Sequence, residues 1–167
     1  MSSPLRSLLG GLLFLLGFAS GQAELQVGDE FPSLAAAGLT GGDLPATGGK
    51  VVVVDFWASW CAPCKASFPM FAKLHQEFGS RGLVIVAVGV DEKPAAYAAF
   101  VQKLNPPFVT LHDQAQRLVA AVKVPAMPTS YLLGRNGRVR FVHQGFHGRE
   151  TELEMRRQIE ILLSEKE

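Results

Sequence analysis

Cys61 and Cys64 are the residues of this chain whose side chains are best suited to covalent chemistry. They are its only cysteines, and two residues separate them in Trp60-Cys61-Ala62-Pro63-Cys64-Lys65. An apolar run at 51–57 precedes them and a helical pattern follows, so the pair lies at a predicted strand-to-helix junction. Free N–H groups and the helix dipole stabilise an anion there, which lowers the pKa of the first thiol. The motif therefore predicts a redox-active pair.

The two thiols are expected to have different roles. Cys61, at the helix start, should be the more exposed and should attack a partner's disulfide to form a mixed disulfide. Cys64 should then resolve that intermediate, releasing the reduced partner and leaving a Cys61–Cys64 disulfide. The alternative is an inert structural bridge of the kind found in exported domains. Because a bridge across so short a loop constrains the unfolded chain little, the redox interpretation is favoured.

Asp55 is a third candidate catalytic residue, six positions before Cys61 in the apolar run. A carboxylate without a partner in such surroundings is costly, so its pKa is expected to be raised. Such an acid can exchange a proton with Cys64 while the mixed disulfide is resolved. The alternative is a strand-edge aspartate that accepts hydrogen bonds from backbone donors.

Residues 1–23 have the features of an export segment. Arg6 is their only charge, and the 12-residue apolar run at 8–19 is short for a membrane span. Gly21-Gln22-Ala23 offers a cleavage site after Ala23. The segment predicts export, with either a cleaved signal peptide or a retained N-terminal anchor that would associate with the membrane.

Residues 24–167 suit one domain with its own core. The chain has 16 Lys and Arg against 15 Asp and Glu, without a basic run, so nucleic acid is not expected as a partner. The glycine pairs 41–42 and 48–49 precede no predicted helix and do not match a nucleotide-binding fingerprint. No cofactor is predicted.

Hydrophobic periodicity predicts a mixed α/β architecture. Strands are expected at 51–56, 83–90, 108–111, 130–133 and 138–143, and helices at 62–78, 94–104, 115–122 and 150–163. Asn136-Gly137 marks a hairpin between the last two strands. The expected order, β-β-α-β-α-β-α-β-β-α, includes one further strand before residue 51. It predicts a mixed central sheet with helices on both faces.

The histidines do not predict a metal site. His143 and His147 provide zinc-type ligands alongside the two cysteines, but 78 residues separate Cys64 from His143, far outside the usual spacing. His75 and His112 are expected to be surface or half-buried residues without a chemical role.

Several motifs, in order from about residue 51 to 163, resemble the thioredoxin fold. They are the strand acid in Asp55-Phe56-Trp57, the active-site motif 60–65, the helix proline Pro69, the cis-proline loop Met127-Pro128-Thr129 and Gly145 after the last strand. The resemblance implies that Pro128 is cis and shapes a groove beside Cys61. It also implies that Trp60, Pro63, Met127, Pro128 and Thr129 form the substrate-binding surface, with the Met127 backbone pairing with an extended peptide.

One departure from thioredoxin narrows the family. Asp91 and Pro128 are 37 positions apart, which leaves room for an extra helix and strand at about 94–111. With the export segment and Cys-x-Pro-Cys, this is similar to the TlpA/ResA-like family of exported, membrane-associated thiol–disulfide proteins. ResA-like members carry a glutamate three residues after the second cysteine, where this chain has Ser67. Here Asp55 is expected to supply the carboxylate instead.

The family resemblance implies a periplasmic reductase. Its substrates would be disulfide-bearing envelope proteins, its electrons would come from a membrane thiol conduit, and cytochrome c maturation is one role found in the family. A disulfide-forming oxidant and a copper-handling thioredoxin-fold protein are the alternatives. Copper chaperones of this fold usually space their cysteines by three and add a histidine. A peroxiredoxin-type peroxidase is disfavoured because residues 56–61 lack the Pro and Thr/Ser that precede a peroxidatic cysteine.

Overall fold

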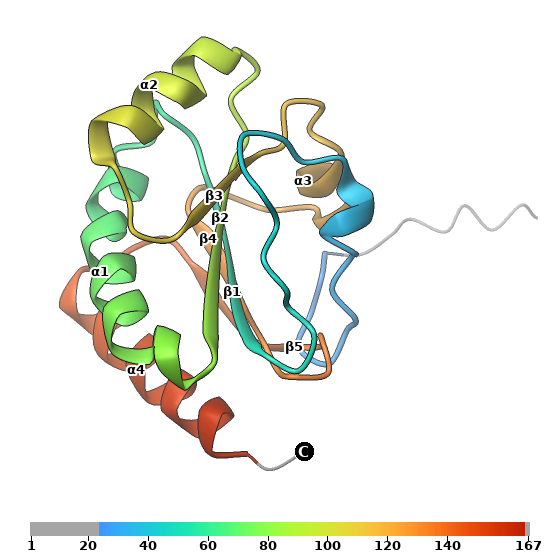
Figure 1. Cartoon of the computed structure of the whole chain (residues 1–167), viewed down its shortest axis with the longest axis vertical. Coiled ribbons are helices and arrows are strands. Elements are labelled where there is room, and N and C mark those ends of the chain that lie inside the picture. Colours follow the sequence, from blue (N-terminus) through green and yellow to red (C-terminus); the bar gives the residue numbers. More distant parts are fainter. Residues whose placement is uncertain (1–23, 166–167) are drawn as a thin grey trace, which may run out of the picture.

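The computed structural model describes residues 24–165 as a central sheet covered by helices (Figure 1), and the predicted export segment lies outside these residues. The strands are β1 (Val51–Trp57), β2 (Leu83–Gly89), β3 (Val109–His112), β4 (Thr129–Leu133) and β5 (Val139–Gln144). The α-helices are α1 (Ala62–Phe78), α2 (Pro94–Leu104), α3 (Arg117–Val122) and α4 (Arg149–Ser164), and the 3-10 turns are η1 (Ala35–Ala37) and η2 (Gly79–Arg81). Within 24–165, no helix combines the length and apolarity needed to cross a bilayer.

The five strands lie in the order β3-β2-β1-β4-β5. β1 pairs in parallel with β2, and β2 with β3, whereas β4 is antiparallel to both β1 and β5. Figure 1 shows α1, α2 and α4 on one face of the sheet, and α3 with the segment 24–50 on the other. The predicted mixed α/β sheet with helices on both faces is confirmed.

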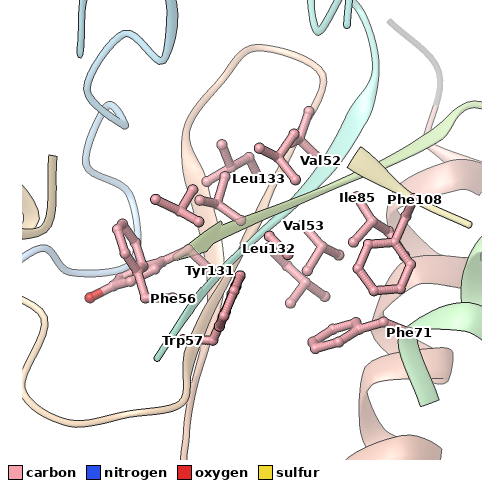
Figure 2. Packing of buried hydrophobic residues seen from close by; sticks show 14 of the residues in the cluster. Val52, Val53, Phe56, Trp57, Phe71, Ile85, Phe108, Tyr131, Leu132 and Leu133 are labelled. Carbon is pink, nitrogen blue, oxygen red and sulfur yellow. The ribbon is translucent and has the colours of Figure 1, made fainter. Parts of the chain in front are cut away.

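β1 is the middle strand of the sheet, and the side chains on both of its faces are buried. On the α1 face, the Trp57 ring stacks on Phe100 of α2 at 4.3 Å and meets Phe68 of α1 edge-on at 5.5 Å. On the other face, Phe56 meets Tyr131 edge-on at 6.0 Å. Figure 2 shows Phe56, Trp57 and Tyr131 among the buried side chains that pack around β1. The strand that leads to Cys61 is therefore held rigidly from both sides.

The predicted insert forms α2 and β3, and α2 packs against the β1–α1 unit. Tyr97 stacks on Trp57 at 5.5 Å. Gly89 permits this approach, since a Cβ there would lie 2.6 Å from Tyr97 and 2.8 Å from Trp57. The insert is thus part of the core on the face of the sheet that α1 covers.

The expected strand before residue 51 is wrong. Within the described part of segment 24–50, strand-like pairing is limited to two isolated bridges, from Glu30 to Arg138 and from Thr40 to His112. These bridges contact opposite edges of the sheet, beside β5 and at β3. The segment crosses one face of the sheet instead of adding a strand, and its apolar run at 34–39 contains the η1 turn instead of an extended strand.

His112 is also not where the sequence placed it. β3 runs one residue further than expected, and His112 is its last residue, only 3% exposed. Its ring stacks on Tyr97 at 4.4 Å, and Nε2 lies 2.6 Å from the Asp91 carbonyl oxygen. α3 begins at Arg117, later than the expected 115, and the Asp113 carboxylate, which precedes the N-cap Gln116, accepts the Arg117 N–H at 3.0 Å and the Val119 N–H at 2.8 Å.

Candidate redox site

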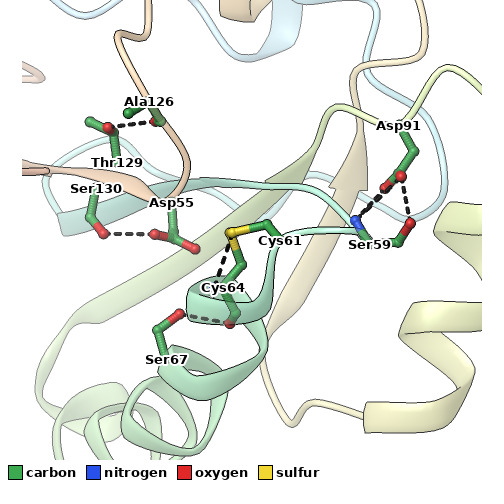
Figure 3. Close-up of a disulfide and its surroundings, with 9 residues drawn as sticks. All are labelled: Asp55, Ser59, Cys61, Cys64, Ser67, Asp91, Ala126, Thr129 and Ser130. Carbon is green, nitrogen blue, oxygen red and sulfur yellow. Dashed lines mark hydrogen bonds between the residues drawn. A yellow bond between two sulfur atoms is a disulfide. The ribbon is translucent and has the colours of Figure 1, made fainter. Parts of the chain in front are cut away.

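A disulfide joins Cys61 and Cys64 at the junction of β1 and α1 (Figure 3). Cys61 is the N-cap of α1, and its sulfur accepts the Cys64 backbone N–H at 3.2 Å. Cys61 is 4% exposed and Cys64 is 0% exposed, so Cys61 is the more accessible sulfur. An attacking group from a partner therefore reaches Cys61 first.

The first turn of α1 explains how Cys61 can hold a negative charge. The Cys64 N–H points at the Cys61 sulfur, and Pro63 contributes no N–H in this turn. When Cys61 is reduced, a thiolate at this N-cap would accept that hydrogen bond and lie at the positive end of the helix dipole. Both effects favour the anion and lower the thiol pKa.

Asp55 is completely buried in β1, on the face that α1 covers. Its Oδ1 accepts a hydrogen bond from the Ser130 hydroxyl at 2.6 Å, and its Oδ2 has no partner among the described residues. Figure 3 shows the carboxyl group pointing toward the disulfide. Burial raises the pKa of Asp55 to about 7, and the Ser130 hydrogen bond offsets only part of that rise. The group can therefore gain or lose a proton near neutral pH.

Asp91 is a buried acid that the sequence reasoning did not assign to the site. Its carboxylate accepts the Ser59 backbone N–H at 3.0 Å and the Ser59 hydroxyl at 2.6 Å (Figure 3). Ser59 lies two residues before Cys61, so this pair holds the loop that leads into the motif. A sequence signal existed, because Asp91 follows the apolar run of β2 and so lies at the same end of the parallel pair as Cys61.

The loop before β4 brings the second part of the predicted site close to the motif. The Met127–Pro128 peptide bond is cis. The Pro128 carbonyl accepts the Gly145 N–H at 2.8 Å, and Gly145 has a φ of +81° that a glycine adopts without strain. Thr129 is buried and its hydroxyl donates to the Ala126 carbonyl at 2.8 Å, so this side chain braces the loop from inside.

The sheet topology brings the predicted site residues together. The segment after the end of β1 carries Trp60, Cys61, Pro63 and Cys64. The loop 127–129 leads into β4, the antiparallel neighbour of β1. Trp60, the residue before Cys61, is 73% exposed. Within residues 24–165, no three His, Cys, Asp or Glu side chains converge as metal ligands.

Comparisons with known proteins agree with this geometry. The Redoxin family model matches residues 26–159. The thiol-disulfide oxidoreductase ResA of Bacillus thuringiensis (strain Al Hakam) is 30% identical over 131 residues, covering 77% of this chain and 76% of that protein. ResA of Bacillus subtilis (strain 168) is 32% identical over 133 residues, covering 78% and 74%. A solved Chlorobium tepidum protein, described as a candidate thiol:disulfide interchange protein DsbE, is 31% identical with a TM-score of 0.76, covering 84% of this chain and all of that one.

Proposed function

Because this chain belongs to the Redoxin family and is a ResA-like thiol-disulfide oxidoreductase, we propose that it is exported and reduces disulfides of envelope proteins through Cys61 and Cys64. The observation that carries the proposal is the Cys61 sulfur at the N-cap of α1, next to a buried carboxyl group. The apolar segment 8–19 supports a periplasmic location, reached through a cleaved signal peptide or an N-terminal anchor.

The reaction follows from the different environments of the two thiols. The Cys61 thiolate attacks one sulfur of the partner's disulfide, and the partner's other sulfur leaves as a thiolate that takes up a proton. The Cys64 thiolate then attacks the Cys61 sulfur, forms the Cys61–Cys64 disulfide and releases the second partner thiol. Two electrons and two protons pass to the partner, and the partner's disulfide becomes two thiols.

Asp55 is the proton acceptor for the second step. Cys64 is fully buried, so its thiol needs a base that water does not supply. The Asp55 Oδ2, which has no hydrogen-bond partner within 24–165, is directed toward the disulfide and is suited to accept the Cys64 proton. We expect Asp55→Asn to slow resolution of the mixed disulfide more than the initial attack. Equal slowing of both steps in single-turnover kinetics would remove Asp55 from this role.

The substrate-binding surface is formed by Trp60, Pro63 and the loop at 127–129. Trp60 and Pro63 are exposed on either side of Cys61. Met127 is half-buried, and its backbone has no hydrogen-bond partner among residues 24–165, which leaves it free to pair with an extended peptide. Buried Pro128 and Thr129 contribute by shaping the loop.

A reductase outside the cytoplasm needs electrons from elsewhere. The Cys61–Cys64 disulfide left after each turnover must be reduced again by a dithiol. A membrane thiol conduit would supply these electrons. Its cysteine would attack the same accessible Cys61 sulfur that the substrate uses, so donor and substrate would dock in turn on one surface.

The direction of electron flow is tested by the reduction potential of the Cys61–Cys64 pair. Residues 24–167 would be equilibrated with glutathione or dithiothreitol buffers, and the dithiol fraction followed by thiol alkylation. A value near or below roughly −250 mV, at the thioredoxin end of the range, supports a reductase. A value near roughly −120 mV would make the protein a disulfide donor instead.

Envelope substrates can be identified by stopping the reaction halfway. Cys64→Ser leaves Cys61 able to attack but removes the resolving thiol, so mixed disulfides should accumulate on Cys61. Cys61→Ser is the matched control and should trap little, because Cys64 is fully buried. Equal trapping by both variants would contradict the assignment of Cys61 as the nucleophile.

A further inference from the structure

An open groove of about 490 Å³ lies beside the redox site and reaches the inserted helix α2. Trp60 and Met127 line it on the side of the redox site, Ala96 lines it from α2, and Gln116 and Val119 line it at the start of α3. We refer to the space between these five residues as the insert groove. Its volume lies within the roughly 300–1,000 Å³ typical of specific binding sites.

Five of the residues that line the insert groove are apolar, and the other five are polar or charged: Ser59, Asp91, Glu92, Lys93 and Gln116. Val90 lies at its base, and Ala96, Val119 and Met127 are half-buried around it. The Gln116 Nε2 donates to the Val90 carbonyl at 3.1 Å, while the Gln116 Oε1 has no partner within the described part of the chain. Such a surface suits an aliphatic side chain on an extended segment whose backbone N–H groups need an acceptor.

The reaction itself identifies which segment can reach this groove. In the mixed disulfide, the partner's cysteine is joined to Cys61 by a bond of about 2 Å. Trp60, the residue before Cys61, is a wall of the insert groove. Since an extended chain advances about 3.3–3.6 Å per residue, the partner's residues next to its reacting cysteine must lie over or beside the groove.

We propose that the insert groove receives an apolar side chain adjacent to the reacting cysteine of the partner protein, so that α2 and α3 select the partner. The proposal rests on the proposed disulfide-reducing function. It gives the insert a role in recognition, because Ala96 lies on α2 and Gln116 lies in the connection that follows β3.

The probes are disulfide-linked peptide dimers with one cysteine per chain, flanked on both sides by leucine, serine or lysine, with glutathione disulfide as a substrate too small to use the groove. Second-order rate constants for reduction by the dithiol protein are measured for each. We expect the leucine dimer to react at least about tenfold faster than the serine dimer, which corresponds to about 1.4 kcal/mol and matches partial burial of one aliphatic side chain.

Two variants on one helix separate the groove from its surroundings. Ala96→Trp fills the groove and should abolish the leucine preference while leaving glutathione disulfide reduction within about twofold. Ala99→Trp is the matched control, because Ala99 is exposed on α2 and does not line the groove. It should keep the full preference.

Val119→Asp tests the groove from α3, independently of how Ala96→Trp folds. This variant should lower the rate constant for reduction of the leucine dimer and raise the rate constant for the lysine dimer. If the wild-type protein reduces all three dimers equally and both tryptophan variants behave alike, the groove has no role in selection, while the reductase function stands. If it reduces neither the dimers nor glutathione disulfide, the proposed function and the groove proposal both fail.

Discussion

Asp55 makes a prediction about stability that is separate from catalysis. Burial raises its pKa from 3.8 to about 7, so between these values the folded protein keeps a proton that the unfolded chain has lost. Stability therefore falls as pH rises through this range. This contribution is fully present below about pH 4, and is lost above about pH 7. One pKa unit corresponds to about 1.36 kcal/mol, so the total loss is about 4 kcal/mol.

Asp55→Asn removes the titrating group and should flatten this dependence. The asparagine Oδ1 can still accept the Ser130 hydrogen bond, but its amide N–H groups take the place of an oxygen without a partner. An unsatisfied buried donor costs about 1–3 kcal/mol at every pH. The informative quantity is therefore the change in unfolding free energy with pH, which that constant cost does not affect.

The assay is urea unfolding of the oxidised protein, followed by tryptophan fluorescence from pH 4.5 to pH 8.5. Wild type should lose about 3–4 kcal/mol more than Asp55→Asn across this range. Asp43→Asn, the same substitution at an exposed aspartate, should follow the wild-type profile. Parallel profiles for wild type and Asp55→Asn would refute the raised pKa of Asp55 on which its proposed role as a base depends.

Three further substitutions test the core, the rim and the loop of the site. Phe71→Ala should lower the free energy of unfolding in urea by about 3–5 kcal/mol, because Phe71 is completely buried between α1 and the sheet. Phe71→Leu should lower it less. Trp60→Ala should leave unfolding within about 0.5 kcal/mol, because Trp60 is exposed, yet slow reduction of peptide disulfides. Asp91→Ala should cost about 1–3 kcal/mol by leaving the Ser59 donors without an acceptor, and Ser59→Ala should cost less. Asp91→Ala should also change the pKa of the Cys61 thiol, measured by the pH dependence of its alkylation. An unchanged pKa would confine Asp91 to a structural role.

Sequence reasoning succeeded where the signal is local. The β-branched run of β1 and the Cys-x-x-Cys that follows are contiguous, so the strand, the helix start and the position of Cys61 could all be predicted. Asp55 also stood out, because a charge inside an apolar run is visible without knowledge of its neighbours. These features depend on periodicity and on helix ends, which a short segment determines by itself.

The errors lie where partners are distant in the chain. His112 looked like an isolated polar residue, but its contact is the Asp91 carbonyl, 21 residues away. Asp91 itself bonds to Ser59 across 32 residues. The expected order of elements included one strand before residue 51, but segment 24–50 forms two isolated bridges to opposite edges of the sheet. Such contacts depend on how the sheet assembles, and a single sequence does not reveal them.

The two buried acids of the site show why burial by itself does not identify a catalytic group. Asp55 and Asp91 are both almost free of solvent; Asp55 lies within β1, and Asp91 lies just after β2. Asp91 accepts hydrogen bonds from both donors of Ser59, so it orients the loop that leads to Cys61. Asp55 has one donor and one oxygen without a partner within 24–165, so its charged form is disfavoured and its proton is exchangeable near neutral pH. The number of donors around each carboxylate, more than its depth, therefore separates Asp91, which holds the loop, from Asp55, which we propose as the proton acceptor.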